Sequence, residues 1–100
     1  MKMLTLICRE GIEDEIQVML SDLKIEGYTV ISGVLGSGQT GPVTGKAWTD
    51  RNTLYLIALD DARMVPLVNA VREVHTRLVQ ENDGREVPLK VFLQPCDLIV

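Results

Sequence analysis

The stretch at residues 33–45, Gly-Val-Leu-Gly-Ser-Gly-Gln-Thr-Gly-Pro-Val-Thr-Gly, decides how this chain of 100 residues divides. Five of its thirteen positions are glycine. A glycine-rich segment of this length is typical of a long connection or a binding loop, because its backbone has no single preferred conformation. Patterns typical of strands and helices alternate on both sides of it. The stretch therefore predicts a long loop between two similarly built halves.

The half before this loop reads as strand, helix, strand. Residues 3–8 are apolar and rich in β-branched side chains, which predicts a strand. Three acidic residues at 13–15 favour the first turn of a helix, where carboxylates complement the helix dipole. We expect this helix to end at Gly27 and a strand to occupy residues 28–35. The apolar stripe of the helix consists of Ile12, Ile16, Met19, Leu20 and Leu23.

The half after the loop repeats this order. Residues 53–59 predict a central strand, and Asp60-Asp61 predicts the start of a second helix, with Pro66 near its first turn. A turn at Asp83-Gly84 then precedes a strand at 89–93, and residues 98–100 are compatible with one more short strand. The apolar stripe of the second helix consists of Met64, Leu67, Val68, Val71, Val74 and Leu78.

The order of elements predicts the fold class. Strand, helix, strand, strand, helix, strand is typical of an α+β ferredoxin-like βαββαβ sandwich, in which two helices cover one face of a four-stranded antiparallel sheet. Residues 1–100 are expected to form a single domain. Residues 3–8 and 54–59 are largely apolar at both odd and even positions. Another copy of the chain is therefore expected to cover the open face of the sheet, which predicts a homo-oligomer.

Composition excludes several classes of partner. The net charge of −4 and the aromatic content of 4% disfavour nucleic-acid binding. No apolar run is long enough to span a membrane, and the first residues do not resemble a signal peptide, so we expect a cytoplasmic protein. Cys8 and Cys96 are expected at opposite ends of neighbouring strands, too far apart for a disulfide.

The sequence contains no pattern that indicates an enzyme. There is no Cys-x-x-Cys motif, and no nucleophile lies at a suitable spacing from a base. His75 is the single histidine, which disfavours a metal site, and Arg9 is interpreted as a cation at the end of a strand. Residues 36–39 follow a strand and can present successive N–H groups to an anion. The same pattern also fits a flexible hairpin connection, so both interpretations stay open.

One stretch resembles a known family. Ile25-Glu26-Gly27-Tyr28-Thr29-Val30, followed by a Gly-x-Gly and a long loop, is similar to the P-II signal-transduction family, and the order of elements matches over essentially the whole chain. The resemblance implies a non-enzymatic regulatory protein that forms a homotrimer. It also implies a nucleotide cleft between subunits and a T-loop, here residues 36–52, that contacts a partner protein such as a transporter or an enzyme.

The resemblance also implies the residues of the cleft. Ile7 and Thr29 match positions on its adenine side, and Lys90 matches a lysine that contacts phosphate. The remaining matches lie at the base of the loop. They are Gly36 and Gly38 of the Gly-x-Gly, Ser37 between them, and Gln39, which falls where the family has an Arg-Gln pair that contacts phosphate and a metal-bound effector.

The chain departs from the family where phosphate is held. The family's Thr-Gly-x-x-Gly-Asp-Gly-Lys signature is replaced by residues 81–89, Glu-Asn-Asp-Gly-Arg-Glu-Val-Pro-Leu, and its C-terminal arginines have no counterpart before Val100. We therefore expect AMP or ADP to be accommodated more easily than ATP. The alternative is a structural or metal-linked trimer similar to the CutA-type proteins, without nucleotide binding.

Overall fold

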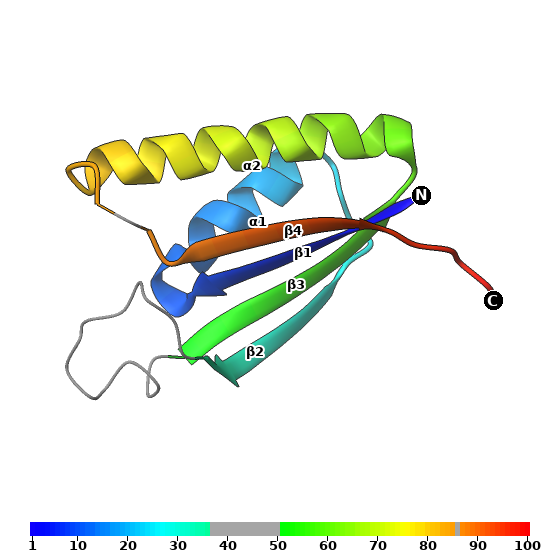
Figure 1. The fold of residues 1–100 in the computed structure, drawn as a ribbon, viewed down its shortest axis with the longest axis horizontal. Helices are drawn as coiled ribbons and strands as arrows, with labels where there is room; N and C mark the ends of the chain where they lie inside the picture. The colour runs from blue at the N-terminus through cyan, green and yellow to red at the C-terminus, as the bar shows by residue number, and fades with distance from the viewer. Residues whose placement is uncertain (37–50, 86) are drawn as a thin grey trace.

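The computed structural model describes residues 1–36, 51–85 and 87–100, in which four strands form one sheet and two α-helices cover one of its faces (Figure 1). The strands are antiparallel and lie in the order β2-β3-β1-β4, which confirms the predicted ferredoxin-like sandwich. The elements are β1 (Lys2–Arg9), η1 (Glu10–Ile12), α1 (Glu13–Asp22), β2 (Thr29–Leu35), β3 (Arg51–Leu59), α2 (Asp61–Glu81) and β4 (Leu89–Pro95).

The core lies between the helices and alternate residues of the two central strands. Even-numbered residues from 4 to 8 in β1 and odd-numbered residues from 53 to 59 in β3 are buried because they face the helices. The predicted helical stripes supply the other side, although Ile12, Leu23, Val68 and Leu78 are only partly buried. The fully buried members include Leu4, Leu6, Cys8, Tyr55, Ile57, Ile16, Leu20 and Leu67.

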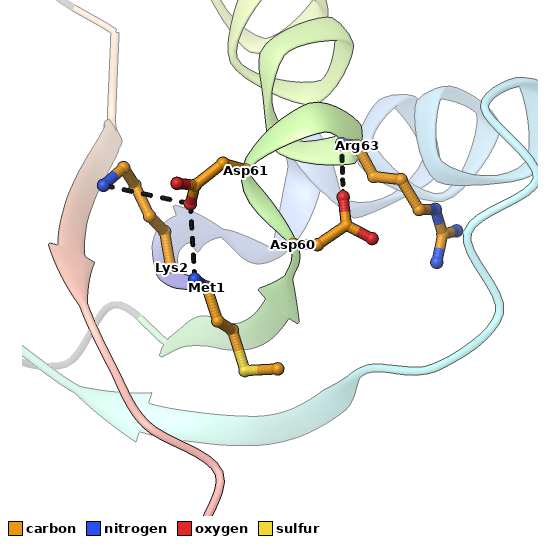
Figure 2. Close-up of polar contacts among 5 residues, drawn as sticks. All are labelled: Met1, Lys2, Asp60, Asp61 and Arg63. Atoms are coloured by element: carbon orange, nitrogen blue, oxygen red, sulfur yellow. Dashed lines mark hydrogen bonds and ion pairs between the residues drawn. The ribbon is translucent and has the colours of Figure 1, made fainter.

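The start of α2 is held by two neighbouring acids, as the sequence predicts. The Asp60 carboxylate accepts a hydrogen bond from the Arg63 backbone N–H at 2.8 Å, which satisfies one of the free donors of the first turn (Figure 2). The Asp61 carboxylate lies 3.4 Å from the Met1 ammonium and 4.0 Å from Lys2 Nζ. Pro66 lies farther along than predicted, in the second turn, where the Ala62 carbonyl loses its helical donor.

The end of α1 differs from the expected stop at Gly27, because the helix ends at Asp22. Lys24 adopts a left-handed conformation with φ 57°, and its N–H donates to the Ser21 carbonyl at 3.0 Å. The Ile25 N–H donates to the Leu20 carbonyl at 2.9 Å, which completes a Schellman motif. Burial of the Ile25 side chain offsets the cost of placing a lysine in that conformation.

The expected short strand at 98–100 is absent, so that prediction is wrong. The reason lies in the length of β1. Its first paired residue, Lys2, already lies opposite Pro95, and the Cys96 N–H donates to the Met1 carbonyl at 3.3 Å. No further residue of β1 remains to pair with residues 97–100.

A bulge interrupts the pairing of β2 with β3. Ile31 pairs with Leu54, yet Val34 pairs with Asn52, so β2 carries one extra residue between these pairs. Gly33 lies in this extra segment with φ 69°, a conformation that a residue with a Cβ rarely adopts. The bulge reverses the alternation expected along residues 28–35, and it places Val34 on the same face as Ile31.

Candidate functional site

The candidate site lies on the sheet face that the helices leave open. Odd-numbered residues of β1 and even-numbered residues of β3 lie on this face, and most are apolar, as the sequence predicts. The edge strands add exposed apolar side chains, with Ile31 of β2 45% exposed and Phe92 of β4 57% exposed. An apolar face of this extent is typical of an interface rather than of a surface that remains in water.

Three of the predicted site residues lie on this open face. Lys90 of β4 pairs directly with Ile7 of β1, so the two side chains leave the sheet next to each other on this face. Thr29 of β2 shares the face, but it lies on the opposite edge of the sheet. Because neighbouring strands are 4.7–4.9 Å apart, about 14 Å separates the backbones of β4 and β2. A single copy of the chain therefore brings Ile7 and Lys90 together and leaves Thr29 apart from them.

The base of the predicted loop adjoins the same end of the face. Gly36 follows β2, and a Cβ at this position would lie 3.2 Å from Asn52 Nδ2, so a glycine permits the close approach. Asn52 pairs with Arg9 of β1, which adds an amide and a second cation to the open-face side of this end. Ser37, Gly38 and Gln39 lie outside the described residues.

Sequence reasoning missed Asn52 and gave Arg9 no role in the site. Their relation depends on the register of β1 against β3, which pairs them although they are 43 positions apart in the chain. The available signal was the parity of Arg9, which matches that of Ile7, a predicted site residue. The Arg9 N–H donates to the Pro88 carbonyl at 3.1 Å, so the connector before β4 is fastened to this end of the sheet.

On the helix side, polar groups form a bridge between α1 and the sheet. Gln17 Nε2 donates to the Tyr55 hydroxyl at 3.1 Å, and the Tyr28 hydroxyl donates to Gln17 Oε1 at 2.9 Å. The Thr53 hydroxyl donates to the Glu13 carboxylate. Burial raises the pKa of Tyr55 above its usual range, while the hydrogen bond from Gln17 acts in the opposite direction. These groups join buried elements, so we assign them a structural role.

The two cysteines are free, and they lie where the sequence predicts. Cys8 is buried near the end of β1, and Cys96 follows β4 at the other end of the β1–β4 pairing. Burial, together with the nearby Glu13 carboxylate, raises the pKa of the Cys8 thiol to about 11. The thiol therefore stays protonated at neutral pH and is a poor nucleophile.

The described part of the chain offers neither a metal-binding cluster nor a helix that could span a membrane. Within residues 1–36, 51–85 and 87–100, no three His, Cys, Asp or Glu side chains lie close enough to hold a metal ion. Neither helix in the described part of the chain has the length and apolar character needed to cross a bilayer.

A known protein family matches almost the whole chain. Residues 1–97 match the family model described as nitrogen regulatory protein P-II. No curated protein sequence matches the chain.

Solved structures of a PII-like protein, CPII from Thiomonas intermedia K12, share the fold. The form bound to ADP and bicarbonate is 18% identical, with a TM-score of 0.63 over 93% of this chain and 82% of that one. The form bound to ADP, AMP and bicarbonate is 16% identical with the same TM-score and coverage. The apo form is also 16% identical with a TM-score of 0.63, over 93% of this chain and 85% of that one.

Proposed function

Because the chain belongs to the P-II family, we propose that it is a non-enzymatic, single-domain regulatory protein that binds an adenine nucleotide between the subunits of a homotrimer. The observation that carries this proposal is the pairing of Lys90 with Ile7 on an apolar open face. A lysine next to an apolar residue suits a ligand that has a flat base at one end and a phosphate at the other.

The division of the site supports its placement between copies. Lys90 lies on one edge strand and Thr29 on the other, with β1 and β3 between them, so the two residues do not adjoin within one copy. A closed ring joins one patch of each copy to a different patch of the next, and we propose that the β4 and β2 edges are those two patches. Both edges expose apolar side chains on the open face, which such an arrangement would cover.

The charge of the described face favours a nucleotide with few phosphates. Arg9 and Lys90 are the cations that the strand register places near Ile7 on the open face of the described residues. Residues 91–100 contain no lysine or arginine. Each added phosphate needs further cationic or N–H partners, so we propose that AMP and ADP bind more tightly than ATP. The CPII structure that holds both ADP and AMP is consistent with this preference.

The remaining parts of the proposal concern the partner. We propose that residues 36–52 contact a partner protein, such as a transporter or an enzyme, and that nucleotide binding at the base of this segment changes that contact. Such coupling requires the nucleotide to interact differently with the two states of the segment. We place the protein in the cytoplasm, where adenine nucleotides are available.

Isothermal titration calorimetry with AMP, ADP and ATP tests the nucleotide site. We expect AMP and ADP to bind, and Lys90→Ala to weaken that binding by about tenfold or more through loss of the phosphate contact. Lys2→Ala is the matched control, because Lys2 lies at the opposite end of β1 beside Asp61. Equal effects of the two substitutions would contradict the role of Lys90. Absence of binding by all three nucleotides would leave only the partner-binding part of the proposal.

A further inference from the structure

A groove of about 530 Å³ lies between α2 and β4, on the helix side of the sheet. Apolar side chains from both elements line it, including Val68, Val71, Val91 and Leu93. Arg72 and His75 of α2 add polar groups to the same groove. Its volume lies in the range of sites that hold a small ligand or a short peptide segment.

The groove opens at the edge of the sheet. β4 is an outermost strand in the order β2-β3-β1-β4, so no strand among the described residues lies beyond it. Leu93 is 46% exposed at this edge even though its strand partner, Leu4, is fully buried. A segment that enters the groove from outside would therefore cover apolar surface that one copy leaves in water.

The same chain carries a segment whose chemistry fits the groove. Residues 96–100 follow β4 without regular secondary structure, and they extend away from the body of the molecule (Figure 1). Leu98, Ile99 and Val100 are 75%, 88% and 105% exposed. Three consecutive exposed apolar residues are unfavourable in water and are typical of a segment that packs against another surface. Asp97 precedes them and is complementary in charge to Arg72.

The length and direction of residues 96–100 indicate whether they fill the groove of their own copy or that of a neighbouring one. Five extended residues span about 16 Å, and the β4 residues that line the groove, 89–93, are also five. Residues 96–100 continue β4 away from these residues, so they would have to reverse direction at once to reach the groove of their own copy. A neighbouring copy requires no such reversal.

We propose that residues 96–100 of one copy bind in the α2–β4 groove of a neighbouring copy. Leu98 and Ile99 pack on its apolar lining, and Asp97 lies near Arg72. This contact shares Lys90 with the proposed nucleotide site, but its apolar lining comes from α2 and from the helix side of β4 rather than from the open face. It fastens neighbouring copies to each other whether or not a nucleotide is bound.

Disulfide trapping tests the contact directly. In a Cys96→Ser background, Thr76→Cys adds a thiol to the groove and Ile99→Cys adds one to the segment. Cys8 is buried and stays protonated, so it does not take part. We expect mild oxidation to link copies covalently in the doubly substituted protein and not in either singly substituted one. Absence of a link between copies, or a link within one copy, would overturn the proposal.

Two pairs of substitutions measure the contribution of the segment, with the oligomer's dissociation midpoint followed by sedimentation. Ile99→Asp should raise the midpoint by about tenfold or more, because it puts a carboxylate against the apolar lining. The control Val65→Asp changes an exposed valine of α2 that does not line the groove, and it should leave the midpoint unchanged. Asp97→Lys should likewise raise the dissociation midpoint. Its control, Glu26→Lys, should raise the midpoint less. Equal midpoints within each pair, or a monomer at every concentration, would overturn the proposal.

Nucleotide titration of the same variants separates this inference from the proposed function. If no covalent link forms but nucleotide still binds, the groove contact is contradicted and the proposed function is not. A covalent link in a protein that binds no nucleotide would support the groove contact and contradict only the nucleotide site.

Discussion

Replacing Gly33 with alanine tests the bulge that shapes β2 beside the candidate site. Gly33 has φ 69°, and a Cβ built on it meets no atom within 4 Å. The cost of the substitution therefore comes from the backbone conformation alone and not from a clash. A left-handed conformation costs an alanine about 1–2 kcal/mol relative to the right-handed one. We expect Gly33→Ala to lower the free energy of unfolding by that amount.

Gly27→Ala is the matched control for this substitution. Gly27 also has no atom within 4 Å of a built Cβ, but its φ lies outside the left-handed region. Alanine at such a position reduces the conformational entropy of the unfolded chain, so we expect stability to be unchanged or raised by about 0.4–1 kcal/mol.

Urea unfolding followed by circular dichroism, at equal protein concentrations, compares the two variants with the unsubstituted chain. We expect Gly33→Ala and Gly27→Ala to change the free energy of unfolding in opposite directions or by clearly different amounts. If Gly33→Ala proves as stable as Gly27→Ala, the bulge does not need a residue without a Cβ. The account of how β2 places Gly36 beside Asn52 would then be wrong.

Three further predictions follow from the helix start and the cysteines. Asp60→Ala should cost about 1 kcal/mol of unfolding free energy through loss of the cap on Arg63 N–H, while Asp61→Ala should cost less because its ion pairs are exposed; chemical unfolding of both variants measures the difference. The pKa of the Cys8 thiol is raised in the folded state, so on raising the pH the thiol loses its proton first in the unfolded chain. The free energy of unfolding should therefore fall by about 2–3 kcal/mol between about pH 9 and pH 11. The pH profile of Cys8→Ala, which lacks the thiol, is the reference. If the difference in unfolding free energy between the two proteins does not change with pH, the burial of the thiol is contradicted. Iodoacetamide should modify Cys96 in the folded protein and Cys8 only after unfolding, which mass spectrometry of digested peptides can follow.

The architecture was predictable because local patterns determine it. The spacing of apolar residues in α1 and α2 indicates which side of each helix is buried. The order of strands and helices along the chain then leaves few ways to pack the two helices on the sheet. The cap at Asp60 was also predictable, since an aspartate before a helix satisfies backbone donors that every helix leaves free. Each of these features depends on residues that are close in the sequence.

The features that the sequence did not predict correctly depend on contacts between residues that are distant in the chain. The Schellman motif that ends α1 places a lysine in a left-handed conformation, and it does so because Ile25 packs into a core that the sequence does not show locally. The bulge in β2 becomes visible only from its register against β3. For the same reason, the sequence did not reveal that β1 is too short to pair with residues 98–100.

The candidate site combines both kinds of information. Family resemblance indicated Ile7, Thr29 and Lys90, and strand parity placed all of them on one face. Only the strand order shows that Thr29 and Lys90 lie on opposite edges of the sheet, which is why we propose a site shared between copies. Asn52 and Arg9 meet through the pairing of β1 with β3, so no local pattern could have identified them together.

The central claim is that one nucleotide site is built from two copies, and a complementation measurement tests it most directly. Thr29→Glu and Lys90→Ala each damage a different half of the proposed site, so neither variant alone should bind ADP at the concentration that saturates the unsubstituted protein. When equal amounts of the two are unfolded together and refolded into mixed rings, a site is intact only where an undamaged Lys90 meets an undamaged Thr29. Random mixing therefore predicts that about one quarter of the sites regain ADP binding, measured as the stoichiometry of a calorimetric titration. No recovery of sites on mixing would contradict a site shared between copies.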